Sequence, residues 1–121
     1  MATTKEHLKQ AKSNESFFAQ VRQLKDFPDW GVTVVFYIAV HYGRALLAFM
    51  GSQITSHQHF QTEFLRKTSD KAAYRHFRSL QTAAESSRYD VVPYAWTDVD
   101  ALAKDHLEPF KTAMKTHGLS F

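Results

Sequence analysis

The residues best suited to chemistry lie inside a long apolar segment, residues 30–51. His41 and Arg44 are three positions apart and Tyr37 precedes His41 by four, so a helix would place all three on one face. A histidine exchanges protons near neutral pH, whereas an arginine stays charged and binds phosphate. The pattern predicts a site at which His41 moves a proton beside a phosphate that Arg44 holds.

The same two residues also fit a purely structural role. His41 could be a core histidine satisfied by hydrogen bonds, and Arg44 could neutralise a carboxylate such as Glu85 or Asp90. Both interpretations require partners, because burying an unpaired polar group is costly. The sequence leaves the two interpretations open.

Three later residues could join the same polar face. His57 lies at the start of a helix, and Arg88 and Tyr89 lie at the end of another. We expect His57 to reach into the bundle and His59 to face water. Arg88 could turn inward beside Tyr89, or it could complement the negative end of its own helix. The chain has no cysteine and no clear third ligand near the two histidines, so we expect no metal site and no cofactor.

A basic stripe is predicted downstream. Its members recur at intervals of four, four and three positions: Lys67, Lys71, Arg75 and Arg78. Aromatic residues such as Tyr74 and Phe77 interleave them, so the stripe could follow the phosphate backbone of a nucleic acid. It could equally be an ordinary solvated helix face.

The apolar spacing that positions these residues predicts an all-α fold. We expect helices over about residues 4–25, 30–51, 56–67, 70–87 and 97–118, with an extended strap over 88–96. The segment 30–51 contains a β-branched run but is too long for a typical strand. Asp29 and Thr97 are expected to cap the second and last helices, Gly51 to end the second, and Pro109 to kink the last. Ser13 and Asn14 mark a point at which the first helix could break.

Size and composition predict one domain, residues 1–121, folded as a four- to five-helix bundle. Hydrophobic residues make up 44% of the 121 residues, enough for a core. Because the segment 30–51 is apolar nearly all round, we expect it at the centre, covered by the other helices or by a second copy. Its central histidine and arginine argue against a membrane span.

Charge and cysteine content restrict the function further. The net charge of +3 permits a polyanionic partner without requiring one. The lack of cysteine and of an apolar signal segment leads us to expect a cytoplasmic protein. Phosphate-binding glycine loops and hydrolase motifs are absent from the sequence.

The chain resembles the HEPN-like helical domain family. The resemblance covers about residues 8–115 and is carried by Trp30, the run Phe36–His41, Ala45-Leu46, Ser56-His57, Tyr74 and the run Ser86–Tyr89. It implies an all-α bundle of four to five helices that forms a homodimer. Many members are metal-independent ribonucleases in toxin, antiviral and RNA-processing systems, and others are non-catalytic.

In the ribonucleases of that family, an arginine and a histidine lie four to six residues apart on one helix and meet their copies across the dimer interface. The histidine assists attack by a ribose 2′-hydroxyl, and the arginine stabilises the charge on the phosphate. This sequence departs from the motif. No arginine precedes a histidine at that distance, and His41 instead precedes Arg44 with a shorter gap.

Three functions follow as hypotheses. The first is a HEPN-like module, in a toxin or defence system, that associates with RNA but lacks the standard ribonuclease motif, or that cleaves RNA with His41 and Arg44. The second is a non-catalytic, dimerising protein-interaction module. The third is an accessory subunit that binds a nucleotide without turning it over. An open cleft would favour the first hypothesis, and a closed polar network would favour the second.

Overall fold

The computed structural model describes residues 2–121, which contain helices and no strand. The helices are α1 (Thr4–Leu24), α2 (Pro28–Phe49), α3 (His57–Thr68), α4 (Lys71–Tyr89), α5 (Trp96–Leu102) and α6 (Glu108–Thr116). A π-helical turn (Ala103–Leu107) joins α5 to α6 without interruption. These last three elements form one continuous segment, so the chain makes five helical segments. The all-α prediction is confirmed.

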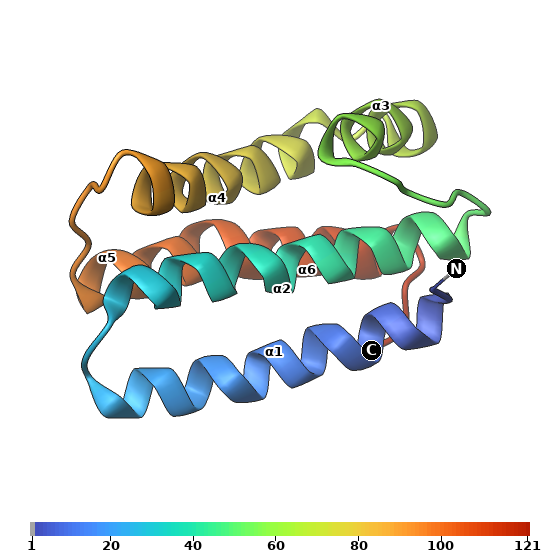
Figure 1. Cartoon of the computed structure of the whole chain (residues 1–121). Coiled ribbons are helices and arrows are strands. Elements are labelled where there is room, and N and C mark those ends of the chain that lie inside the picture. Colours follow the sequence, from blue (N-terminus) through green and yellow to red (C-terminus); the bar gives the residue numbers. More distant parts are fainter. Residues whose placement is uncertain (1) are drawn as a thin grey trace.

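Helix α2 lies at the centre of the bundle. It contacts all the other helices, and Figure 1 shows it between α1 and α4, with α5 and α6 behind it. Its side chains supply much of the core, including Phe36, Ile38 and Leu46, each at most 1% exposed. The apolar sequence of α2 therefore reflects packing on several sides.

Helix α2 is long enough to be considered as a membrane-spanning helix. Within residues 2–121 it is the one helix long and apolar enough to cross a bilayer. However, 67% of its most apolar 18-residue window is buried inside the fold. Contacts within the bundle account for its hydrophobicity.

Two glycines allow other elements to approach α2 closely. A Cβ atom on Gly43 would lie 2.6 Å from Cζ of Phe60, and one on Gly31 would lie 2.7 Å from the ring of Trp96. Phe60 belongs to a cluster of buried rings contributed by α3, α4 and α6: Phe60, Phe64, Phe77 and Phe110. Gly43 thus lets the aromatic core sit directly on the backbone of α2.

The helix ends agree with the sequence in some places and differ in others. Gly51 follows α2 with φ of 88°, as expected. Asp29 is not the cap of α2, because Pro28 already occupies its first turn, where a missing N–H costs nothing. Thr97 does not cap α5; the helix starts at Trp96, and the Asp98 carboxylate accepts the backbone N–H of Ala95 at 2.8 Å. The possible break at residues 13–14 does not occur, since α1 is continuous.

The predicted kink at Pro109 takes the form of the π turn. Proline cannot donate a helical hydrogen bond, and its ring crowds the carbonyl four residues earlier. Immediately before it, the N–H of Glu108 donates to the carbonyl of Ala103, five residues back. The wider turn accommodates one additional residue and brings Leu107 into the core beside Val99, the two being 5% and 0% exposed.

Candidate functional site

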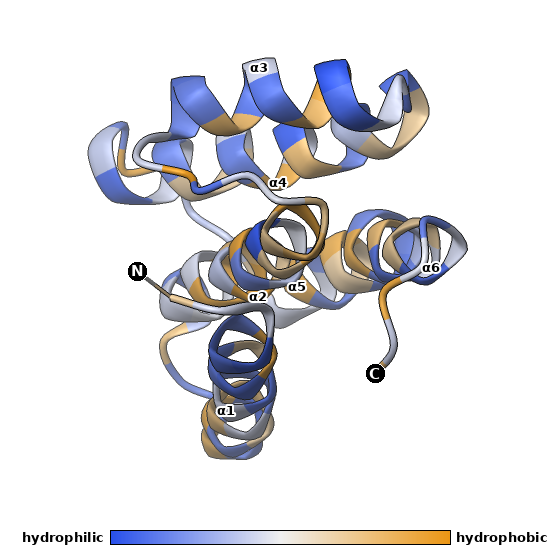
Figure 2. Cartoon of the chain, turned by 90° about the vertical axis from the view of Figure 1, so that its right-hand side faces the viewer, coloured by the Kyte–Doolittle hydropathy of each residue, from blue (hydrophilic) through white to orange (hydrophobic). Residues whose placement is uncertain are grey.

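One side of α2 is not covered by other helices. A stripe of residues at helical spacing remains partly or fully exposed there, and we call it the open face: Trp30, Tyr37, His41, Arg44 and Ala48. Viewed along the bundle, α1 and α4 flank α2 while α5 and α6 occupy only one side (Figure 2). The expectation that α2 is buried nearly all round is therefore correct except along this stripe and at the helix ends, where Asp29 and Phe49 are exposed.

Three hollows follow the open face from the beginning of α2 toward its end. The first, about 200 Å³, is lined by Asp29, Trp30, Thr33, Ser87 and Arg88. The second, about 450 Å³, is lined by Phe36, Tyr37, His57, Gln81, Glu85, Arg88, Tyr89 and Asp90. The third, about 460 Å³, is lined by Ala2, Glu6, His7, Lys9, Gln10, Ser13 and His41. Tyr37 thus opens onto a hollow beside α4 and His41 onto one beside α1, whereas Arg44 lines none of the three.

Arg88 is positioned by two tyrosines and by its own helix. Its Nη1 donates to the hydroxyl of Tyr37 at 3.2 Å, and its guanidinium lies 5.2 Å from the ring centroid of Tyr89. Its Nε also donates to the carbonyl of Ala84 at 3.3 Å, in the last turns of α4. Arg88 therefore turns toward the tyrosines and also donates to a carbonyl near the end of its own helix, which are the two roles expected for it.

His41 is paired with a histidine that the sequence did not point to. His7 of α1 places its Nδ1 3.1 Å from Nδ1 of His41, so one ring donates and the other accepts. Burial, then His7 and Arg44, lower the pKa of His41 to about 4. Burial, then Arg44, lower the pKa of His7. Both rings are neutral at pH 7. The available signal was the spacing of His7 from the buried Ala11, four positions later on α1.

Arg44 has no anionic partner. Its Nε is buried and makes no hydrogen bond, and no carboxylate of residues 2–121 forms an ion pair with it. The expected neutralisation by Glu85 or Asp90 is wrong, since Glu85 instead lies 4.0 Å from Arg78. The charge of Arg44 contributes to lowering the pKa values of three histidines: His7, His41 and His57.

His57 and His59 are placed differently from the expectation. His57 is exposed at the rim of the second hollow, with one side of its ring packed 5.6 Å from that of Phe36. Partial burial, then the charge of Arg44, lower its pKa. His59 is the more buried of the two, and its ring accepts the N–H of Thr55, two residues before α3, at 3.3 Å.

The four residues of the basic stripe lie on two helices, the third and fourth, as predicted. Lys67 lies on α3, where its ammonium donates to the carbonyl of Met50, whereas the other three lie on α4. Lys71 and Arg75 are exposed, and Arg78 donates to Gln81 at 2.9 Å. None of the four lines a hollow of the open face.

The open face has the chemistry of an anion site. Arg88 lines two of the hollows, beside uncharged His57 and the tyrosine hydroxyls, and Arg44 lies on the same face of α2. Carboxylates also line these hollows, namely Asp29, Glu85 and Asp90, but none of them forms an ion pair with either arginine. Between positions 2 and 121, no three histidine or acidic side chains are placed to hold a metal ion. The arrangement is suited to binding phosphate or carboxylate groups.

Comparisons with protein-family models, with curated proteins and with solved structures give no match.

Proposed function

We propose that this protein is a HEPN-like module that binds RNA on the open face of α2, with Arg44 and Arg88 contacting phosphates. The observation that carries the proposal is the half-buried Arg44, whose charge has no partner within the described chain. Burial also disfavours the charged guanidinium, and no described carboxylate offsets that cost. An external anion at the exposed part of the guanidinium would stabilise the charge.

The site also has features that suit a polynucleotide. Arginine presents a planar fork that matches phosphate oxygens. An exposed aromatic side chain lies beside the guanidinium of Arg88: Tyr89 is 75% exposed, with its ring centroid 5.2 Å from that guanidinium. A base can stack on such a ring while the arginines hold the backbone.

Binding without cleavage fits this site better than catalysis. A general base or acid works best when its pKa is near the working pH. The pKa of His41, lowered to about 4, is far below neutrality. The arginine–histidine spacing of the family's ribonucleases is also absent. A metal-independent ribonuclease using His41 and Arg44 is the alternative, and His41→Ala would then abolish cleavage of RNA.

Dimerisation through the same face belongs to the proposal. Trp30 stands at one end of the stripe, and Leu24 and Phe27, exposed by 64% and 59%, lie just before it in the chain. A second copy would cover these side chains and bring two arginine pairs together. The non-catalytic, dimerising interaction module is the corresponding alternative if RNA does not bind.

The experiment compares two arginine variants in RNA binding. Fluorescence anisotropy measures the affinity for a labelled 20-nucleotide RNA, and thermal melting measures stability. Arg44→Met should weaken binding about tenfold or more, as expected for a lost charge-assisted contact. Its melting temperature should stay level or rise, because the unpaired buried Nε is removed.

Arg75→Met is the matched control, since it removes one exposed arginine from α4. It should change affinity by less than about threefold, the effect of one screened surface charge. If Arg75→Met is the more damaging variant, RNA follows the α4 residues instead and the proposal fails. Absence of RNA binding by the unmodified protein would also refute it.

A further inference from the structure

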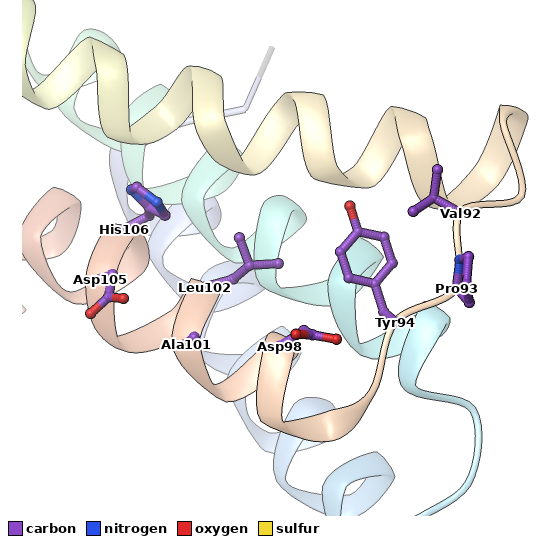
Figure 3. Close-up of a pocket in the computed structure, with 8 residues that line it drawn as sticks. All are labelled: Val92, Pro93, Tyr94, Asp98, Ala101, Leu102, Asp105 and His106. Carbon is purple, nitrogen blue, oxygen red and sulfur yellow. The ribbon is translucent and has the colours of Figure 1, made fainter.

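A second groove lies between α4 and the α5–π-turn segment. It has a volume of about 390 Å³ and is lined by Val92, Pro93, Tyr94, Asp98, Ala101, Leu102, Asp105 and His106. Figure 3 shows it bounded by α4 above, by α5 and the π turn below, and by the strap after α4 at one end. It shares no lining residue with the three hollows of the open face.

The groove has an apolar floor and an acidic rim. Tyr94 and Leu102 project toward α4, whereas Asp98 and Asp105 point outward from the lower helix (Figure 3). Neither carboxylate forms an ion pair with any described residue, although Asp98 accepts the N–H of Ala95. Both carboxylates therefore offer unpaired negative charge at the rim, on a chain whose net charge is +3.

Two neighbouring acidic residues on the same helical segment lie close to basic side chains, unlike Asp98 and Asp105. Asp100 pairs with Arg22 at 2.9 Å, and Glu108 lies 3.7 Å from Lys111. At the end of the groove, Nδ1 of His106 lies 3.0 Å from Nδ1 of His76. Burial, followed by the charges of His106 and Arg75, lowers the pKa of His76. The imidazole of His76 is neutral at pH 7 and does not offset the acidic rim.

The backbone is irregular at both ends of the groove. Val91, next to Val92, has φ of 54°, a conformation that β-branched residues rarely adopt, and its side chain is 81% exposed. At the other end, the π turn carries Asp105 and His106. Strained residues and π turns occur preferentially at functional sites.

We propose that this groove docks a basic amphipathic helix of a partner protein. Leucine-like residues of that helix pack on Tyr94 and Leu102, and two lysines or arginines seven positions apart pair with Asp98 and Asp105. The acidic residues are themselves seven positions apart, with Ala101 and Leu102 between them. The partner's cations and apolar residues thus have the complementary spacing, about 10 Å over two helical turns.

The shape of the groove favours a helix over a small molecule. Small-molecule sites enclose most of their ligand, whereas this groove is open along its acidic side (Figure 3). A shallow groove between two helices with exposed Val92 at its rim offers apolar area to a third helix. The proposal is independent of RNA binding on the open face.

The test uses the full chain and a labelled synthetic 18-residue helix. That peptide carries lysines at positions i and i+7 and leucines at i+3 and i+4. Asp105→Lys should weaken binding about tenfold, because an attraction becomes a repulsion. Asp98 is left unchanged, because its carboxylate caps α5. Asp26→Lys, which makes the same charge change in the exposed α1–α2 loop, should alter affinity less than twofold.

Backbone amide shifts locate the peptide, and they should change within residues 92–106 and the facing side of α4. Equal weakening by the two charge reversals would overturn the proposal, since the attraction would then be non-specific. Shifts confined to α1 and α2, or no binding at all, would do the same. Spermidine can also be added so that its ammonium groups match those of the peptide in concentration. If it displaces the peptide, the groove binds small polycations and the proposal of a helix fails.

Discussion

Arg44 is the arginine whose Nε is buried without a hydrogen-bond partner among the described residues. Arg22, Arg66, Arg78 and Lys111 form ion pairs, whereas the other lysines and arginines of residues 2–121 do not. Surface pairs contribute little stability each, so their absence at exposed positions costs little. A half-buried guanidinium with an unsatisfied donor is different, because burial makes the missing partner costly. This position is therefore the one at which an external partner would matter most.

His41 should make stability depend on pH. Its pKa is about 4 in the folded protein, against 6.5 for an ordinary histidine. Between these values the unfolded chain binds more protons than the folded one, so the free energy of unfolding falls as pH falls. We expect a loss of about 1 kcal/mol between pH 7.5 and pH 5, after allowing for the half-exposed ring. Urea denaturation at the two pH values measures it.

His41→Gln tests the origin of that pH effect. Glutamine keeps a hydrogen-bonding side chain but does not titrate, so the difference between pH 7.5 and pH 5 should shrink. Burial and Arg44 also lower the pKa of His7, so part of the slope should remain. An unchanged slope in the variant would contradict the assignment.

At the scale of helices, Gly43 determines how closely α3 packs on α2. Alanine is favoured over glycine in a helix by about 1 kcal/mol. In Gly43→Ala, however, the new Cβ would lie 2.6 Å from Cζ of Phe60, which is 1% exposed and cannot move freely. Overpacking of this kind costs about 1–3 kcal/mol. We therefore expect Gly43→Ala to lower the melting temperature.

A compensating variant separates overpacking from other effects of the Gly43 change. Phe60→Leu shortens the opposing side chain, so the double variant should lose less stability than the sum of the two single losses. A Gly43→Ala protein more stable than the unmodified one would show that Phe60 readily shifts.

Helices and their order were predictable because apolar spacing and capping residues are local signals. The first residues of α2 and α5 were harder to predict. Pro28 and Asp98 stabilise the observed starts of these helices, whereas the sequence indicated Asp29 and Thr97 as the capping residues. The π turn has two causes, the hydrogen bond that Pro109 cannot make and the burial of the apolar residues around it. The second cause involves contacts between helices, which local sequence signals do not reveal.

The polar site was predictable to the extent that it lies on one helix. Tyr37, His41 and Arg44 share a stripe because of their spacing alone. His7 was missed because its contact with His41 spans 34 positions and depends on how α1 packs on α2. The prediction that Glu85 neutralises Arg44 was wrong for a related reason. The position of the Glu85 carboxylate depends on how α4 packs in the bundle.

At the scale of the whole molecule, exposed apolar side chains gather where α1 ends, α2 begins and α4 ends. They are Leu24, Phe27, Trp30, Tyr89, Val91 and Val92, each at least 42% exposed. These segments lie at the same end of the bundle (Figure 1). Patches of this kind mark interaction surfaces.

If a second copy covers this end, one substitution should dissociate it. Trp30→Glu should convert a dimer to a monomer in sedimentation-velocity experiments, because it places a charge in the apolar contact. Phe49→Glu is the control, since Phe49 is 59% exposed on the opposite end of α2, against 58% for Trp30. Dissociation by both variants, or a monomeric unmodified protein, would contradict this interface.

The π turn also determines which length changes the chain can tolerate. Deleting one residue within 103–107 would remove the additional residue that the π turn accommodates, so a regular α-helix could replace the turn. Phe110 and Met114, now fully buried, would keep facing the interior. Natural variants of this chain that lack the extra residue should therefore have a regular helix here, with their C-terminal apolar side chains one position nearer to α5 in the sequence.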